Sequence, residues 1–312
     1  MEERLYATQM EAARKGIVTK ELEIVAKKEK MEANPFKLKK ELPHLPGYII
    51  VILWTAFIFC MIGWIILASL STTKEIFTGG LLASGLHFEN YTKALFTNKA
   101  ALNLLNSVIY TVPSCILIIV VCAPAAYCMS RFKFRGAGLI QALIIIGLAI
   151  PNIMIVMPLF SVVSALNLSG THFTLIFLYT ACSVPYTTFF LLTFFKGIST
   201  SFEEAAAIDG CGPVQCFWKI MFPLAQPAIV TVSIFNFIGK WNEYFMALIF
   251  ANKSNLRPIG VGLYQTVTSM MNSGDWAGMF ASVVIVFVPT VVIYAFLSDK
   301  IISGVTAGGN KG

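Results

Sequence analysis

The chain has 312 residues, of which 57% are hydrophobic and 12% are charged. An ordinary soluble domain carries about 25% charged residues, so this composition excludes a soluble globular protein. The net charge of +7 is concentrated between long hydrophobic runs, and we interpret it as a sign of membrane orientation rather than of nucleic-acid binding.

The first 46 residues form a charged N-terminal arm that precedes any hydrophobic run. Glu and Lys recur in it at helical spacing, and three prolines near its end stop any helix before the membrane domain begins. We expect a solvated cytoplasmic arm, either a surface helix or a frayed tail. Residues 47–303 are expected to form the membrane domain, and the glycine-rich residues 304–312 a C-terminal tail.

Six hydrophobic runs are long enough to cross a bilayer, since a membrane-spanning helix needs about 20 mostly apolar residues. They predict an all-α integral membrane protein with six transmembrane helices. Prolines inside the runs predict kinked helices, which a packed transmembrane bundle tolerates. The runs cover residues 48–70, 104–130, 139–163, 172–195, 228–250 and 279–298.

The distribution of Lys and Arg predicts that both termini are cytoplasmic. Ten of these residues lie in the N-terminal arm, three between spans two and three, two between spans four and five, and two after span six. The opposite side holds five. Because basic residues favour the cytoplasmic side, segments 71–103 and 251–277 are predicted to lie outside. None of the seven cysteines falls in these outer segments, so no structural disulfide is expected.

The loop between spans four and five, residues 196–227, has sequence patterns that are typical of helices. Ser201 and Glu204 have the spacing of a capping box, which predicts a helix from about residue 202. Gly210 suits the left-handed turn that ends a helix, and Pro213 suits the first position of a second helix. Apolar residues then recur at helical spacing, at Val214, Phe217, Trp218 and Met221. The loop is therefore predicted to be helix, glycine turn, helix.

Such a unit on a cytoplasmic loop can either cap the protein's own bundle or dock into a partner. Ala205 and Ala206 allow the close approach of a partner. The carboxylates of Glu203, Glu204 and Asp209 can pair with basic residues in a partner's groove. The residue types alone leave both roles open.

One resemblance favours docking. The pattern of Glu204-Ala205-Ala206, Gly210, Ile220 and Phe222-Pro223 resembles the cytoplasmic loop signature of permease subunits of binding-protein-dependent ABC importers. Phe222 replaces the usual Leu and Cys211 a common Ala, and both changes keep the apolar character. The stretches "WNEYFMALIF" (241–250), "LRPIGVGL" (256–263) and "GVTAGGNKG" (304–312) resemble the carbohydrate branch, especially the smaller permease of maltose-type transporters. The likeness covers roughly residues 48–312.

The resemblance implies that this loop is the coupling helix, which sits in a cleft of a separate ATPase subunit. Its implied coupling residues are Glu203, Glu204, Ala205, Ala206, Asp209, Gly210 and Pro223. The implied partners are a pair of cytoplasmic ATPase subunits, a second permease expected to be a different chain, an external solute-binding protein and membrane lipid. The tail would reach between the two ATPases, and the implied location is the cell (inner) membrane of a bacterium or archaeon.

Span five contains a polar stripe near the middle of the membrane. Asn236, Lys240 and Glu243 fall at i, i+4 and i+7, and charges at that depth face a cavity or each other. Lys240 and Glu243 can form an ion pair that stabilises the bundle, or the stripe can line a path and bind sugar hydroxyls. Asn152, which follows Pro151 in span three, is a candidate of the same kind.

These features predict a transport subunit rather than an enzyme. The sequence has no phosphate-binding loop and no metal-ligand spacing, so no cofactor is expected on this chain, and ATP and Mg are expected on the partner ATPase. The predicted function is half of the translocation pathway for a sugar or oligosaccharide in an ATP-driven importer. The alternatives are an importer for another solute, such as a polyol phosphate or an amino acid, and a secondary transporter. The last would need inverted repeats and acidic residues in several spans.

Overall fold

The computed structural model describes the backbone of residues 45–309 and the side chains of residues 46–296. Within these residues every regular element is helical, so the all-α prediction is confirmed for this range. The predicted N-terminal arm, residues 1–46, lies outside the described residues apart from its last two, which begin helix α3.

The chain divides into two compact units, of which the first ends at Ile62 and the second begins at Gly63. The described part of the first unit is the beginning of α3 (Leu45–Ser69), a helix of 25 residues without a charged side chain. A helix of this size is about 37 Å long at 1.5 Å per residue, and it can cross the hydrocarbon core of a bilayer.

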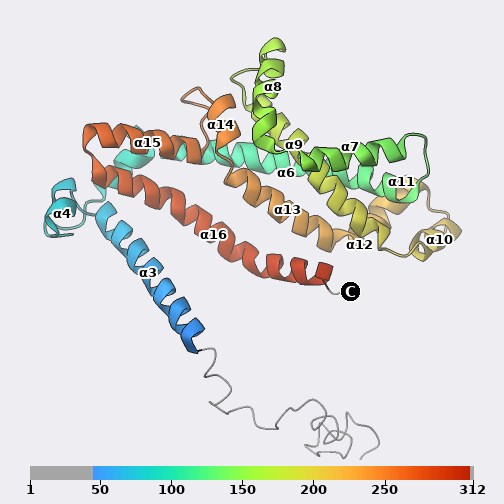
Figure 1. The fold of residues 1–312 in the computed structure, drawn as a ribbon, viewed down its shortest axis with the longest axis horizontal. Helices are drawn as coiled ribbons and strands as arrows, with labels where there is room; N and C mark the ends of the chain where they lie inside the picture. The colour runs from blue at the N-terminus through green and yellow to red at the C-terminus, as the bar shows by residue number, and fades with distance from the viewer. Residues whose placement is uncertain (1–44, 310–312) are drawn as a thin grey trace, which may run out of the picture. The chain divides into compact units, whose positions relative to one another are not determined.

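The second unit is built from long helices that run side by side (Figure 1). α6 (Ala100–Arg131) packs along α9 (His172–Lys196), and α13 (Gln226–Trp241) packs against both of them and against α16 (Trp276–Gly309). The core has two parts. One surrounds Tyr127, Phe195, Phe217 and Met221, and the other surrounds Tyr110, Tyr179, Met246 and Phe250.

Two of the predicted spans are broken. Four helices in the described chain are long and apolar enough to cross a membrane. Two bent pairs of helices would each add a span if the pair is counted as one; they are Ala137–Ala149 with Asn152–Ala165, and Pro213–Leu224 with Gln226–Trp241. α7 (Ala137–Ala149) and α8 (Asn152–Ala165) meet at an angle of 108°. The bend falls at Pro151, because the residue before a proline is driven out of the helical conformation, and Ile150 has ψ of 119°.

The fifth predicted span, residues 228–250, is not a single helix. α13 ends at Trp241, and a separate short helix, α14 (Phe245–Phe250), follows it. The Glu243 carboxylate accepts the backbone N–H groups of Met246 at 2.7 Å and of Ala247 at 3.0 Å. These are two of the N–H groups that a helix start leaves without an intrahelical partner. Glu243 therefore stabilises a new helix start inside an apolar run.

The predicted outer segments contain more helix than their sequences indicated. Residues 71–103 include α4 (Thr73–Thr78), α5 (Glu89–Thr92), the π-helix η3 (Lys93–Thr97) and the start of α6. Residues 251–277 include α15 (Ile259–Ser273). At the other terminus, α16 continues to Gly309, so most of the segment expected as a separate tail (304–312) is helical.

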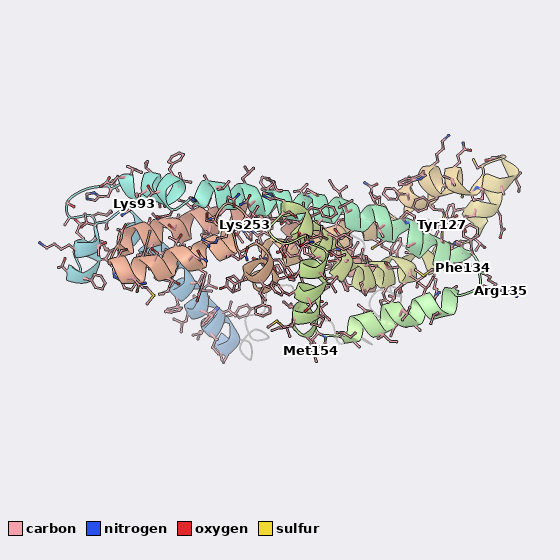
Figure 2. All side chains as sticks on the ribbon, turned by 90° about the horizontal axis from the view of Figure 1, so that it is seen from above. Lys93, Tyr127, Phe134, Arg135, Met154 and Lys253 are labelled. Atoms are coloured by element: carbon pink, nitrogen blue, oxygen red, sulfur yellow. The ribbon has the colours of Figure 1, made fainter. Side chains whose placement is uncertain are left out.

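The second unit has two opposite ends, each marked by different helices. Figure 1 shows α4 and the turn between α15 and α16 at one end, and α10 (Ser201–Ile208) at the opposite end. In Figure 2, Lys93 and Tyr127 lie toward these two ends. We call them the α15 end and the α10 end.

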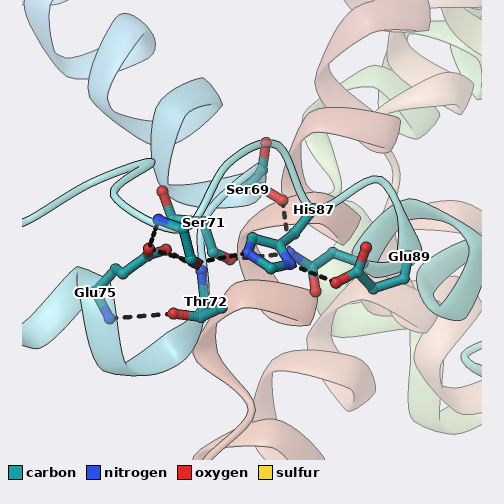
Figure 3. Close-up of polar contacts among 8 residues, drawn as sticks. Ser69, Ser71, Thr72, Glu75, His87 and Glu89 are labelled. Atoms are coloured by element: carbon teal, nitrogen blue, oxygen red, sulfur yellow. Dashed lines mark hydrogen bonds and ion pairs between the residues drawn. The ribbon is translucent and has the colours of Figure 1, made fainter.

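A polar network orders the segment around α4 at the α15 end (Figure 3). Thr72 and Glu75 form a capping box at the start of α4. Glu75 also accepts the backbone N–H of Ser84 at 2.5 Å and its hydroxyl at 2.6 Å. The hydrogen bond from the Ser84 hydroxyl is the largest cause that lowers the pKa of Glu75 from 4.5 to about 2. His87 Nδ1 lies 2.5 Å from Glu89 Oε1, which extends the network to α5.

Candidate functional site

The start of α10 differs from the sequence-based expectation. The helix begins at Ser201, and the residue before it, Thr200, is itself in a helical conformation with no side-chain capping bond. The Ser201 hydroxyl instead lies 2.8 Å from the hydroxyl of Ser199. The capping box expected for Ser201 and Glu204 is therefore wrong. Glu203 and Glu204 still lie in the first turn, where the helix dipole favours negative charge.

The turn after α10 has the geometry that its glycines indicated. Gly210 has φ of 79°, and the N–H of Cys211 donates to the carbonyl of Ala206 at 2.9 Å. Pro213 is the first residue of α11 (Pro213–Cys216). The π-helix η4 (Phe217–Met221) and the short α12 (Phe222–Leu224) follow. π-helical turns occur frequently at functional sites.

One face of this unit is packed into the bundle. Ala206, Phe217 and Met221 are buried and belong to the core cluster around Tyr127. The other two members of the predicted apolar stripe, Val214 and Trp218, are exposed. The stripe therefore contributes to the core at only two of its four positions.

Glu203 is engaged inside the protein. Its Oε2 lies 2.7 Å from Nε of Arg131, the last residue of α6. Arg131 Nη2 also donates to the carbonyl of Ile198 at 2.7 Å. Sequence reasoning assigned Glu203 to a partner and gave Arg131 no role, because 71 intervening residues separate the two and no local pattern connects them.

The remaining face of α10 is open. Glu204, Ala205 and Asp209 are exposed, and Ile208 exposes 88% of its surface. Phe202 on the same helix is 48% exposed. Sequence reasoning missed Ile208 and Phe202. A signal was available in the sequence: this short acidic helix carries two large apolar side chains. The one buried residue of the helix is the small Ala206, so the core does not take up the two large side chains.

Gly210 and Pro223 are also exposed. A Cβ placed on Gly210 would meet no atom within 4 Å, so only the positive φ restricts this position to glycine. Of the seven predicted coupling residues, five are accessible from outside the bundle, and two, Glu203 and Ala206, make internal contacts.

The polar residues of the predicted fifth span separate into two groups. The Tyr179 hydroxyl donates to Oε2 of Glu243 at 2.7 Å, and Nζ of Lys240 lies 5.3 Å from the centre of the same tyrosine ring. In the described part of the chain, Lys240 and Glu243 form no ion pair with each other. They meet through Tyr179, which sequence reasoning did not single out.

Asn236 belongs to the packing of the bundle. It is 6% exposed, and its Nδ2 donates to Thr187 Oγ1 and to the carbonyl of Val232, each at 2.9 Å. Asn152 is exposed at the first residue of α8. Among the described residues it shares no hydrogen bond with the Tyr179 group. The structure therefore brings together Lys240 and Glu243, and not Asn236 or Asn152.

The long apolar helices and the short exposed unit at the α10 end define a multi-pass α-helical membrane protein. The described residues contain no group of three His, Cys, Asp or Glu side chains that could hold a metal ion. Residues 116–301 match the family of binding-protein-dependent transport system inner membrane components, and the chain belongs to this family.

Several relatives align over most of the chain. It is 31% identical over 263 residues to the diacetylchitobiose uptake system permease protein of Streptomyces coelicolor, covering 84% of this chain and 87% of the relative. It is 33% identical over 253 residues to the sulfoquinovosyl glycerol transport system permease protein of Agrobacterium fabrum, covering 80% and 87%. The trehalose/maltose transport system permease protein of Thermococcus litoralis is 30% identical over 254 residues, covering 80% and 90%.

The fold is also similar to that of a solved structure. The crystal structure of a bacterial ABC transporter involved in the import of the acidic polysaccharide alginate contains a chain that superimposes with a TM-score of 0.72. The match covers 85% of this chain and 99% of that chain at 23% sequence identity. The fold is thus shared although most residues differ.

Proposed function

We propose that the chain is a permease subunit of an ATP-driven ABC importer and forms half of the pathway for a sugar or oligosaccharide delivered by an external binding protein. The observation that carries the proposal is the open face of α10, where Glu204, Ala205 and Ile208 are exposed at one end of the bundle. A cap on the protein's own bundle would bury this face. The face instead suits the groove of a separate ATPase subunit.

The internal face of α10 supports the same role. A docking helix transmits movement only if it is fixed to the membrane helices, and the ion pair between Arg131 and Glu203 joins α10 to the end of α6. The buried contacts of Ala206 and Phe217 join it to the core. A push on α10 by an ATPase would therefore move α6 as well.

The partners and orientation follow from this assignment. The α10 end and both termini lie in the cytoplasm, and segments 71–103 and 251–277 lie outside, as the distribution of Lys and Arg along the sequence predicts. Two ATPase subunits bind ATP and Mg, and a second permease of different sequence completes the path. The location is the cell (inner) membrane.

The carbohydrate assignment is supported by the relatives, whose names specify diacetylchitobiose, sulfoquinovosyl glycerol and trehalose or maltose transport. Lys240 and Glu243 supply a cation and a carboxylate along the proposed path, and the buried Tyr179 fixes the Glu243 carboxylate through its hydroxyl. Charged and hydrogen-bonding groups of this kind suit a hydroxylated solute.

Reconstitution tests the proposal. The permease pair, the ATPase subunits and the binding protein are placed in proteoliposomes, and ATP hydrolysis and sugar uptake are measured together. Glu204→Lys should assemble the permease pair and lose sugar-stimulated hydrolysis, because like charges would face a basic groove. Glu204→Gln, which removes the charge without reversing it, is the matched control and should lose less. Normal hydrolysis and uptake by Glu204→Lys would leave α10 as a structural cap.

A further inference from the structure

A polar pocket of about 220 Å³ lies at the α15 end of the second unit. It is formed by the residues before and at the start of α6, the loop before α15, and α15 itself. The side chains that matter here are Asn98, Lys99, Asn103, Arg257, Gln265 and Thr266. Two of them are cations, and none of the residues that line the pocket is acidic.

Three buried polar atoms of this pocket have no hydrogen-bond partner among the described residues. They are Nδ2 of Asn98, Nε of Arg257 and Oδ1 of Asn103. Asn103 is only 4% exposed. A buried polar group without a partner is costly, and such groups in folded proteins are nearly always satisfied. These three atoms are therefore available to a partner that offers acceptors to Asn98 and Arg257 and a donor to Asn103.

The electrostatics of the pocket favour a negative group. α6 is a helix of 32 residues whose first turn has no acidic residue and whose N-cap, Lys99, makes no side-chain capping bond. The free N–H groups at such a helix start attract anions. The Lys99 and Arg257 side chains add positive charge at the same place. A carboxylate in the pocket would interact favourably with the start of α6 and with both cationic side chains.

The pocket is preformed. Asn106 Nδ2 donates to the carbonyls of Asn255 at 2.9 Å and of Arg257 at 3.0 Å, and the Tyr110 hydroxyl donates to the carbonyl of Leu256 at 2.7 Å. These bonds hold the loop before α15 against α6. A partner would therefore bind to an ordered surface, which lowers the entropy cost of association.

The pocket also lies at the part of α6 that extends beyond the start of α9. α9 has 25 residues and is about 37 Å long, which is enough to cross the hydrocarbon core. Its first residue, His172, is within hydrogen-bond distance of Asn106, at 3.1 Å. The part of α6 before Asn106 therefore extends past the start of α9, away from the α10 end, and lies outside the hydrocarbon core when α9 crosses it.

We propose that this pocket receives an Asp or Glu side chain of the external solute-binding protein, with a backbone N–H of the same loop donating to Asn103. The inference rests on the proposed function, because the pocket faces the outside only in the orientation given above. A sugar hydroxyl can also donate and accept. The two cations, the uncapped helix start and the lack of an acid in the lining favour a charged protein side chain over a neutral sugar.

A charge-selective thiol probe tests the pocket directly. Thr266→Cys in a cysteine-depleted permease, within the full transporter, is treated with an anionic or a cationic methanethiosulfonate of similar size. The anionic reagent should react about tenfold faster, and Arg257→Gln with Lys99→Gln should abolish the preference. Lys253→Gln, which removes a cation from the same loop but outside the pocket lining, should keep it. Equal rates for both reagents would overturn the proposal.

Binding-protein titration tests the partner. In reconstituted transporter, Arg257→Gln should raise the concentration of sugar-loaded binding protein needed for half-maximal ATP hydrolysis by about tenfold at low salt, while Lys253→Gln leaves it unchanged. The binding protein, and not free sugar alone, should slow the reaction of Thr266→Cys. Protection by free sugar alone would overturn the proposal in favour of a sugar site.

The same titration separates the two hypotheses. A wild-type transporter that the binding protein does not stimulate would contradict the proposed function. A wild-type transporter that is stimulated, together with an Arg257→Gln variant of identical half-maximal concentration, would contradict only the pocket's role.

Discussion

Arg131 and Glu203 form an ion pair of 2.7 Å between the last residue of α6 and the first turn of α10. Their side chains are only 10% and 18% exposed, so water screens the pair weakly. Arg131 also holds the carbonyl of Ile198, and it therefore connects three segments at the α10 end: α6, the link after α9, and α10.

Breaking this ion pair should uncouple the transporter. Arg131→Met leaves the carboxylate of Glu203 without its partner, and removing one member of a buried pair costs about 3 kcal/mol. We expect a lower melting temperature in detergent and a lower ratio of uptake to ATP hydrolysis. The double variant Arg131→Met, Glu203→Leu leaves no charge unpaired and should recover most of the stability but not the coupling. Equal coupling in wild type and double variant would show that the pair acts only on stability.

Position 210 should require glycine because of its backbone conformation and not because of steric crowding by neighbouring atoms. Gly210→Ala places a Cβ at φ of 79° and should cost about 1 kcal/mol, because the left-handed region is strained for residues other than glycine. Gly212→Ala is the matched control, since Gly212 has φ of −69° and its Cβ would also meet open space. Thermal unfolding of both variants measures the difference. Equal losses at the two positions would contradict a left-handed turn.

The exposed side chain of Ile208 should matter for assembly but not for folding. Ile208 is 88% exposed, so Ile208→Asp removes almost no internal contact and should leave the melting temperature of the permease unchanged. It should reduce co-purification of the ATPase subunits at least tenfold, since a charge would enter an apolar contact. Phe96→Asp at the α15 end, where Phe96 is 73% exposed, is the control and should retain the ATPases.

The network around α4 should make stability depend on pH in the acidic range. The pKa of Glu75 is lowered from 4.5 to about 2 by hydrogen bonds, first of all from Ser84. A carboxyl group whose pKa is lowered by folding stabilises the fold fully above its unfolded pKa, and this contribution is lost as pH falls toward the folded pKa. The difference in melting temperature between wild type and Glu75→Gln should therefore be largest above about pH 5.5 and shrink below pH 4.5. Glu204→Gln, at an exposed carboxylate on α10, is the control, and a difference for Glu75→Gln that is constant from pH 7 to pH 3 would contradict this account.

The sequence by itself determined the features that depend on local physics. Long apolar runs can only be buried in lipid or in a bundle, so the all-helical membrane class could be predicted. Gly210 and Pro213 have backbone preferences that act within one residue, and the turn between α10 and α11 has the geometry that these preferences require. The acidic first turn of α10 is also a local feature of the sequence, but the residue types alone left open whether this helix caps the bundle or docks into a partner.

Only the tertiary structure decided which polar groups pair. Glu203 binds Arg131, Glu243 binds Tyr179, and Asn236 binds Thr187. Each pair joins residues at least 49 positions apart, and no helical or strand period connects such distances in the sequence. The same long-range bonds explain the wrong predictions. Glu243 has a charged neighbour at helical spacing, but its carboxylate instead accepts hydrogen bonds from the backbone at the start of α14 and from the tyrosine hydroxyl of α9.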